Sequence, residues 1–191
     1  HNRCRRQRQM CIRDRSTIYF LSKKKYNSII LNYDELSHDL FAWYQQLVAE
    51  SLGKNSKGVL PIISEMPRDN HSLMQLYLDG TKNCFYTFFD VNEKNSPKIK
   101  KNLIKNKFKF LKNHNLQSIK SAQKNATKRV FTSNKIPFRS FEITNRNEEC
   151  LGELFTYFML ETILLGKLMK INPFNQPSVE LIKKETKKIL V

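Results

Sequence analysis

Two short strings of this sequence place titratable side chains at the ends of expected helices. WYQQLVAESLGK puts Glu50 in the last turn of an amphipathic helix. A carboxylate there faces the negative end of the helix dipole, which disfavours its ionised form and makes it a stronger base. PRDNHSLMQLYLDG puts His71 at the start of a helix, where the neutral imidazole is favoured and could exchange protons with an oxygen. Each residue is a candidate for acid–base chemistry, and each also fits a surface or capping role.

A third string, NPFNQPSVELIK, precedes and opens the final expected helix. Gln176 lies just before that helix and Lys183 lies on it. Taken alone, one lysine in a lysine-rich tail indicates a solvated surface.

The sequence shows no pattern typical of a metal site or a nucleotide cofactor site. Cys4, Cys11, Cys84 and Cys150 lack metal-ligand spacing, and the five glycines form neither a dinucleotide-binding nor a P-loop pattern. We therefore expect no metal and no cofactor. Four widely separated cysteines suit a reducing compartment, so we expect a cytoplasmic protein.

Strands alternate with helices along the chain. The patterns predict strands at residues 27–33, 59–64, 84–91 and 137–144, and helices at 34–53, 70–80, 115–133, 151–171 and 178–190. Gly53 and Gly80 end two of these helices. Such alternation predicts an α/β fold class, with a parallel sheet covered by helices on both faces.

Two of the predicted helices carry more specific expectations. In the 34–53 helix, Leu36, Leu40, Trp43, Leu47 and Val48 form the apolar positions. In the final helix, Ser178 is a candidate N-cap, and Val179, Ile182 and Ile189 should face inward, with Lys183 at the boundary of that face.

Positive charge is concentrated in two stretches of a chain with a formal net charge of +17. Residues 1–15 carry six arginines against one acid, and they lack the apolar run of a signal peptide. We interpret this basic head as non-native, adapter-like sequence. Residues 98–135 carry eleven lysines and one arginine with no acid, interleaved with Phe108 and Phe110. A nucleic acid could follow such a stretch, but we expect a solvated surface and no nucleic-acid partner.

The expected helix at 151–171 is the most apolar segment. Glu153, Glu161 and Lys167 interrupt it, and no run of 18 apolar residues occurs. We therefore expect a buried core helix and no membrane partner.

Together, the three strings match one family in order and spacing. YQQLVAESLGK resembles its QQ…ES.GK segment, DNHSLMQLYLDG its histidine segment, and GKLMKINPFNQPSVELIK its C-terminal signature, where only Ser178 departs from the preferred Gly or Ala. The family is phosphoglucose isomerase. The resemblance implies an enzyme that interconverts glucose 6-phosphate and fructose 6-phosphate through a cis-enediol. It also implies a three-layer fold of the sugar-isomerase (SIS) type.

The resemblance implies a role for each matched residue. Glu50 corresponds to the general base that moves a proton between carbon 2 and carbon 1. His71 and Lys183 correspond to residues that assist opening of the sugar ring, and His71 reaches the site across a dimer interface. Gln176 corresponds to a glutamine of the substrate site. No metal or nucleotide takes part.

Family members are longer than this chain and have two SIS domains. The resemblance implies that upstream sequence supplies the Ser/Thr loop for the substrate phosphate and an arginine that steadies the enediolate. We expect residues 16–191 to be the C-terminal SIS-type domain and C-terminal helices of such an enzyme, weakly active or inactive alone, and a homodimer at full length. A preceding transaldolase domain, a non-catalytic phosphosugar-binding module and a basic nucleic-acid binder stay open as alternatives.

Overall fold

The computed structural model describes residues 17–92, 96–99 and 104–190. The basic head, residues 1–15, lies outside these ranges. The strands are β1 (Asn27–Asn32), β2 (Leu60–Glu65), β3 (Cys84–Val91) and β4 (Phe138–Ile143). Residues 17–22 are helical. After β1, the α-helices are α2 (His38–Leu52), α3 (Asp69–Ser72), α4 (Met74–Asp79), α5 (Leu116–Ser133), α6 (Glu148–Met169) and α7 (Pro177–Leu190), and the 3-10 helices are η1 (Glu35–Ser37) and η3 (Asn106–Leu111).

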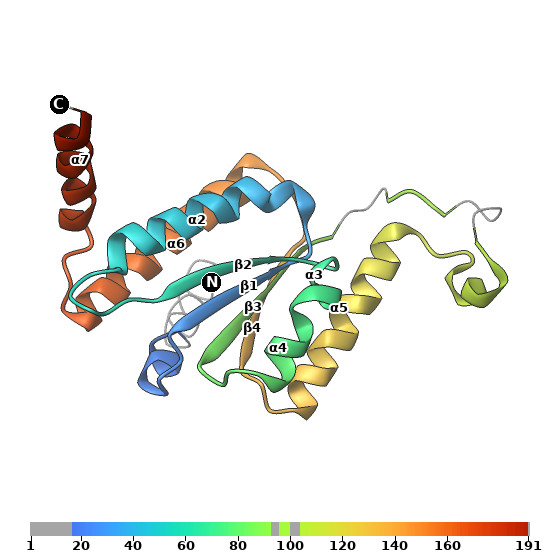
Figure 1. Ribbon diagram of the computed structural model, residues 1–191. Coiled ribbons are helices and arrows are strands. Elements are labelled where there is room, and N and C mark those ends of the chain that lie inside the picture. Colours follow the sequence, from blue (N-terminus) through green and yellow to red (C-terminus); the bar gives the residue numbers. More distant parts are fainter. Residues whose placement is uncertain (1–16, 93–95, 100–103, 191) are drawn as a thin grey trace, which may run out of the picture.

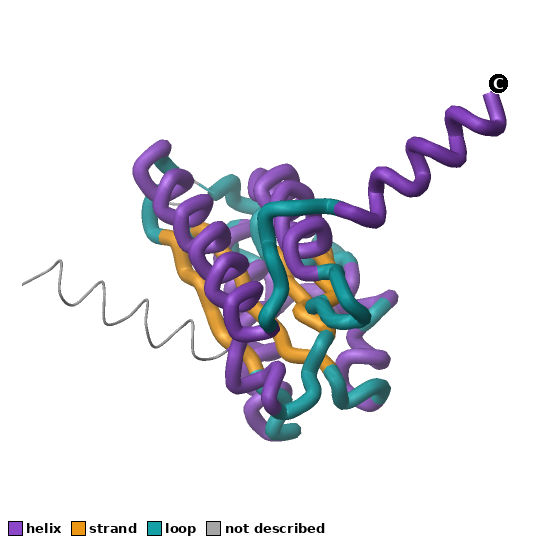
Figure 2. The backbone as a smooth tube through the Cα atoms, turned by 90° about the vertical axis from the view of Figure 1, so that its left-hand side faces the viewer, coloured by secondary structure: helices purple, strands orange, loops and turns teal. Residues whose placement is uncertain are grey.

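The four strands form one parallel sheet in the order β2-β1-β3-β4. Helices α2 and α6 lie on one face, and α3, α4 and α5 lie on the other (Figures 1 and 2). Every residue of β3 is buried, as a parallel strand covered on both faces requires. The predicted α/β fold with a doubly covered sheet is confirmed.

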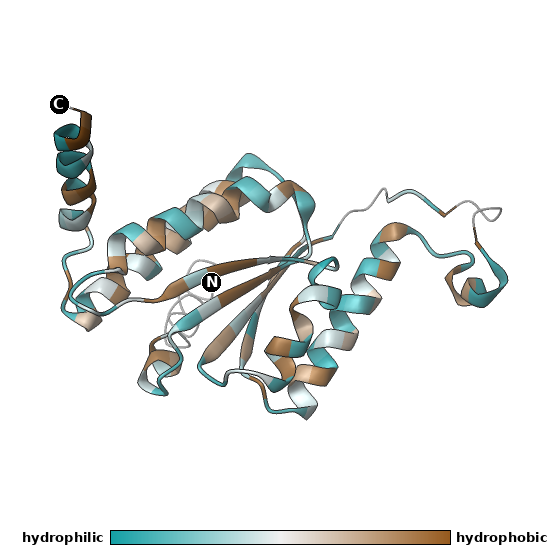
Figure 3. Cartoon of the chain, viewed as in Figure 1, coloured by the Kyte–Doolittle hydropathy of each residue, from teal (hydrophilic) through white to brown (hydrophobic). Residues whose placement is uncertain are grey.

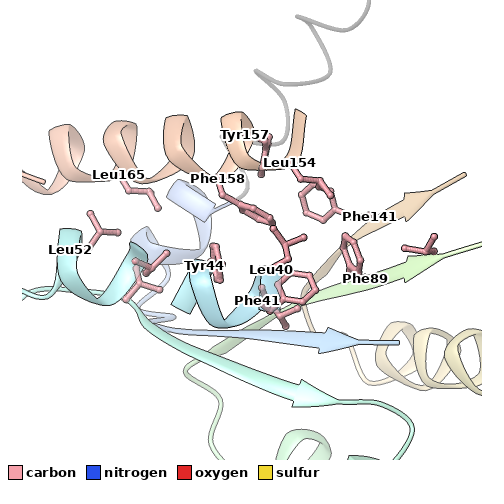
Figure 4. Close-up of a cluster of buried hydrophobic side chains, with 14 residues drawn as sticks. Leu40, Phe41, Tyr44, Leu52, Phe89, Phe141, Leu154, Tyr157, Phe158 and Leu165 are labelled. Carbon is pink, nitrogen blue, oxygen red and sulfur yellow. The ribbon is translucent and has the colours of Figure 1, made fainter. Parts of the chain in front are cut away.

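The core has two halves because successive side chains of a strand point to opposite faces. On the α2 and α6 side, Phe41 of α2 meets Phe89 of β3 edge-to-face with ring centroids 4.8 Å apart, and Tyr44 meets Phe158 of α6 at 4.7 Å (Figure 4). This aromatic packing fixes α2, the helix that carries Glu50.

The predicted start of α2 needs one correction. Residues Glu35–Ser37 form η1, and Leu36, predicted to be a core position, is 72% exposed. Leu40 and Val48 are buried as predicted. The helical period therefore holds only from His38, because the 3-10 turn before it rotates Leu36 away from the core.

A buried ion pair joins β4 to α6. Arg139 Nη2 donates to Glu161 Oε2 at 3.1 Å, and Arg139 Nη1 donates to Tyr157 Oη at 3.0 Å. The Arg139 and Glu161 side chains are 9% and 3% exposed. Glu161 interrupts the most apolar segment of the sequence, and this pairing lets one face of α6 pack into the core. The prediction of a fully buried helix is wrong for the other face, where Leu160, Leu164 and Leu168 are 42%, 40% and 57% exposed. Among the described residues, no helix has the length and apolar character needed to cross a membrane.

Substitution of Arg139 by methionine should destabilise the fold strongly. Arg139→Met leaves the Glu161 carboxylate buried without its cation, which typically costs about 3–5 kcal/mol of unfolding free energy. Urea denaturation followed by circular dichroism measures this loss. The double variant Arg139→Met/Glu161→Leu should recover much of it, and a single variant that loses less than about 1 kcal/mol would show that the pair behaves like a surface pair.

Helix α7 differs from its prediction. Val179, Ile182 and Ile189, expected to face inward, are 42%, 70% and 83% exposed, and no residue of α7 is buried. Figure 3 shows apolar residues on a helix that stands away from the sheet and its covering helices. The period identified an amphipathic helix correctly, but the described residues provide no surface for its apolar face. The helix begins at Pro177, a residue favoured in the first turn, so Ser178 lies within it.

Candidate active site

Glu50 lies in the last turn of α2, at the end of the sheet where the strands begin (Figure 1). The helix ends at Gly53, whose N–H donates to Ala49 O at 3.1 Å. A Cβ on Gly53 would lie 2.8 Å from that carbonyl oxygen, so a side chain here would disturb the end of the helix. The prediction that Gly53 ends this helix is confirmed.

Two amide side chains hold the Glu50 carboxylate from different parts of the chain. Gln46 Nε2, one helical turn earlier, donates to Oε1 at 2.9 Å. Gln176 Nε2, from the segment between α6 and α7, donates to Oε2 at 2.6 Å. Glu50 itself stays partly exposed. Its carboxylate is therefore oriented through both oxygens and still accessible.

Gln46 is a residue that the sequence reasoning did not single out. It precedes Glu50 by four residues on one helix, and residues at that spacing are neighbours on a helix surface. The spacing of four residues between Gln46 and Glu50 in QQLVAE could therefore have predicted this contact.

The segment from residue 170 to 176 packs closely on the end of α6. Lys170 takes a left-handed conformation with φ of 55°, and Ile171 N donates to Gly166 O at 2.8 Å. Gly166 lies against Pro173, where an added Cβ would come within 3.2 Å of the proline ring. The small residue in the C-terminal signature thus allows the chain to turn back toward α2.

Lys183 lies apart from Glu50. Its Nζ donates to Glu180 Oε1 at 2.7 Å on the same face of α7, and both side chains are more than half exposed. The structure therefore brings Gln176 to Glu50, and it leaves Lys183 on the helix that stands off the body.

His71 lies at the other end of the sheet from Glu50. It is the third residue of α3, in that helix's last turn rather than at its start. Strand β2 begins after α2 and ends before α3, so its whole length separates the two residues, which also lie on opposite faces of the sheet (Figure 1). Within one copy of the chain, His71 and Glu50 do not share a site.

Asp69 anchors the helix that carries His71. Its Oδ2 accepts hydrogen bonds from Ser64 Oγ at 3.0 Å and Glu65 N at 2.8 Å. Its Oδ1 accepts from Arg68 Nε and Ser72 Oγ, each at 3.1 Å. Burial alone would raise the pKa of Asp69, but these donors, Arg68 first, hold it below its usual value.

The stability contributed by Asp69 should therefore depend on pH. A carboxyl with a lower pKa in the folded state stabilises that state above its unfolded pKa, and the contribution disappears as pH falls through the folded value. We expect Asp69→Asn to lower the unfolding free energy by about 1–2 kcal/mol at pH 7, with a smaller difference below about pH 4. Urea denaturation of both proteins from about pH 2.5 to about pH 7 measures this. A difference of constant size across that range would mean that the charge is not involved.

A cavity of about 370 Å³ lies at the opposite end of the sheet from Glu50, lined by residues that follow β1 and β2 and by residues of α5. Lys120 lines this cavity, and it belongs to a group of ion pairs between α5 and the ends of β3 and β4. The Asp90 carboxylate forms ion pairs with Lys120 Nζ at 3.0 Å and with Lys124 Nζ at 2.8 Å, and Lys128 forms an ion pair with Glu142. The basic stretch expected to be a solvated surface therefore also neutralises acids at the strand ends, and Lys124 is buried. Among the described residues, no group of three or more His, Cys, Asp or Glu side chains could hold a metal ion.

Comparison with known proteins identifies relatives over nearly the whole chain. The family model described as phosphoglucose isomerase matches residues 16–191. The glucose-6-phosphate isomerase of Mycoplasmopsis pulmonis is 37% identical over 175 residues, which is 90% of this chain and 41% of that protein. That of Methanocaldococcus jannaschii is 33% identical over 163 residues, covering 82% of this chain and 39% of that protein. The chain thus spans about two fifths of the length of these relatives.

Solved structures share the fold. A hypothetical protein from Thermus thermophilus superimposes with a TM-score of 0.83 over 92% of this chain and 44% of its own, at 23% identity. A glucose-6-phosphate isomerase from Chlamydia trachomatis gives a TM-score of 0.71 over 86% of this chain and 34% of its own, at 14% identity.

Proposed function

Because this chain belongs to the phosphoglucose isomerase family, we propose that it forms part of an enzyme that interconverts glucose 6-phosphate and fructose 6-phosphate. The observation that carries the proposal is the Glu50 carboxylate, held through both oxygens by Gln46 and Gln176 and left partly exposed. Family resemblance gives the role of general base to this same residue.

The chemistry suits a fixed carboxylate. In the open-chain aldose, Glu50 removes the proton from carbon 2 while the carbonyl oxygen on carbon 1 gains a proton, which gives a cis-enediol. The hydroxyl on carbon 2 then loses its proton as Glu50 returns the carried proton to carbon 1, which gives the ketose. One base can serve both carbons because they are adjacent, and an oriented carboxylate needs little rearrangement between the two transfers.

Gln46 and Gln176 hold the base in place during these transfers. Each donates an N–H to one oxygen of Glu50, so the ionised form keeps two hydrogen bonds. Lys183 assists ring opening in this proposal, which requires α7 to bring its ammonium toward the sugar when the rest of the enzyme is present.

His71 completes the site from a second copy of the chain. Its place on α3, across the length of the sheet from Glu50, supports a homodimer in which each Glu50 meets the partner's His71. A two-fold symmetric dimer would contain two such sites.

The remaining parts of the proposal concern the whole protein. Residues 16–191 form the C-terminal SIS-type domain and C-terminal helices, residues 1–15 are not native, and upstream sequence supplies the phosphate loop. The enzyme is cytoplasmic and acts in glycolysis and gluconeogenesis, with no metal, cofactor, membrane or nucleic-acid partner. The pairing of α5 lysines with Asp90 and Glu142 supports an internal use for part of the basic stretch.

A graft tests the proposal. Residues 17–191 are joined to the upstream part of the Mycoplasmopsis pulmonis isomerase, the 37% identical relative. We expect the graft to isomerise glucose 6-phosphate in a coupled assay, and the 191-residue chain alone to be at least about 100-fold slower, because phosphate anchoring supplies binding energy used for orientation. A folded graft that binds the phosphosugar without turnover would favour the non-catalytic module.

A further inference from the structure

Two lysines are the first and last residues of a tight turn that follows the helix carrying Glu50. Lys54 N donates to Lys57 O at 3.1 Å, and Lys57 N donates to Lys54 O at 2.9 Å. Between them, Asn55 and Ser56 have φ of 54° and 56°. Two positive φ values are typical of a type I′ turn, which closes a hairpin without splaying its arms. The spacing of the two lysines is therefore fixed by the backbone.

Both ammonium groups reach the chain that leaves α6. Lys57 Nζ donates to Met169 O at 3.0 Å, and Lys54 Nζ donates to Asn172 O at 2.7 Å. Met169 ends α6, where carbonyls lack helical partners and carry the negative end of the helix dipole. Cations are favoured at that position. The two contacts join segments 118 and 112 residues apart in sequence.

The segment held in this way is the one that carries Gln176. Ile171 is buried at its start, but Phe174 is 78% exposed and Gln176 is exposed as well. Apolar packing of Ile171, and of Pro173 against Gly166, therefore anchors the first part of the segment and not residues 174–176, which approach α2. The contact of Lys54 with Asn172 ties this first part of the segment to the turn after α2, four residues before Gln176.

We infer that Lys54 and Lys57 are positioning residues for the isomerase reaction. They attach residues 170–176 to the end of α2 and so set the Gln176 amide against Oε2 of Glu50. This inference rests on the proposed function, because it assigns the lysines to the orientation of the proposed base.

Removing either ammonium should slow the graft without weakening substrate binding. Lys54→Met and Lys57→Met keep most of the aliphatic stem and lose the donor. We expect kcat to fall by about 10-fold and KM to change little, since a misplacement of about 1 Å can cost up to about 100-fold. Lys54→Arg and Lys57→Arg should retain most of kcat. Lys82→Met is the matched control, because Lys82 Nζ caps Leu78 O at 3.0 Å away from the site, and it should leave kcat unchanged.

A double-variant cycle separates positioning from general stabilisation. If the lysines act through Gln176, adding Lys54→Met to Gln176→Ala should cause no further loss of kcat. Losses that multiply, or arginine variants that fail to rescue, would overturn the inference.

A second measurement is independent of activity. In the 191-residue chain, Lys54→Met should speed hydrogen–deuterium exchange of the Phe174 amide, which donates to Asn172 Oδ1 at 3.0 Å, by about 10-fold, while Lys82→Met should not. An inactive parent graft would count against the proposed function alone, and the exchange rates would still decide whether the lysines hold the segment. Unchanged exchange in Lys54→Met would overturn the inference in either case.

Discussion

Glu50→Gln should lower the kcat of the graft by at least about 1,000-fold, which is within the range that positioned proton transfer contributes. Glutamine has nearly the same shape, and its side chain can still contact Gln46 and Gln176, but a neutral amide cannot take the proton from carbon 2. KM should stay within about 3-fold, because the substitution removes a function used in the transition state. Steady-state coupled assays measure both constants.

The control for this substitution is Glu185→Gln. Glu185 lies on exposed α7 and pairs with Lys188 at 2.6 Å, away from Glu50. It should leave kcat unchanged, so an effect confined to position 50 identifies the base. A Glu50→Gln graft with more than about a tenth of parental kcat would overturn the assignment while leaving the fold intact.

Mixing two inactive grafts should restore activity if the site is shared between copies. His71→Ala alone should cost about 100-fold in kcat through loss of a proton-exchanging group. In a dimer that combines a Glu50→Gln copy with a His71→Ala copy, one site carries both substitutions and the other carries neither. Random reassociation should therefore recover about a quarter of the parental activity, because about half of the dimers are mixed and each has one intact site.

The matched control combines Glu50→Gln with Gln176→Ala. These two residues meet within one copy, so neither site of that mixed dimer is intact and parental turnover should not return. Differently tagged copies allow mixed dimers to be purified before assay. Purified mixed dimers of Glu50→Gln and His71→Ala that stay inactive would contradict the shared site.

Local sequence patterns predicted the four strands and most of the helices that cover them, but the single helix predicted at 70–80 is two short helices, α3 and α4. The apolar runs of β1 and β3 are long enough to be buried on both faces, and Gly53 ends α2 because a side chain there would meet Ala49 O. The start of α2 was less predictable, since residues Glu35–Ser37 form a 3-10 turn that helical periodicity does not distinguish from the helix itself.

The candidate site depended on information that local patterns lack. Glu50 and Gln176 are separated by 126 residues, so only family resemblance could bring them together before the structure was known. The contact of Gln46 with Glu50 could have been predicted from their spacing of four residues on one helix. The contacts of Lys54 and Lys57 could not have been predicted in this way, because they require two positive φ values in the turn between the lysines.

The apolar face of α7 shows a different limit of prediction from sequence patterns. Val179 and Ile182 repeat with helical spacing, and that spacing identifies an amphipathic helix regardless of what covers it. Periodicity carries no information about the surface on the other side. The inward orientation could therefore not be derived from the pattern alone.

Solvent isotope incorporation tests the role of Glu50 most directly. The graft is supplied with glucose 6-phosphate in heavy water, and the fructose 6-phosphate formed is analysed by NMR at carbon 1. We predict deuterium at carbon 1, because the proton carried by Glu50 exchanges with solvent in part of the turnovers, and we predict that Glu50→Gln abolishes both product and label. Product that forms at the parental rate in Glu50→Gln, and with the parental amount of deuterium at carbon 1, would contradict proton transfer by this carboxylate.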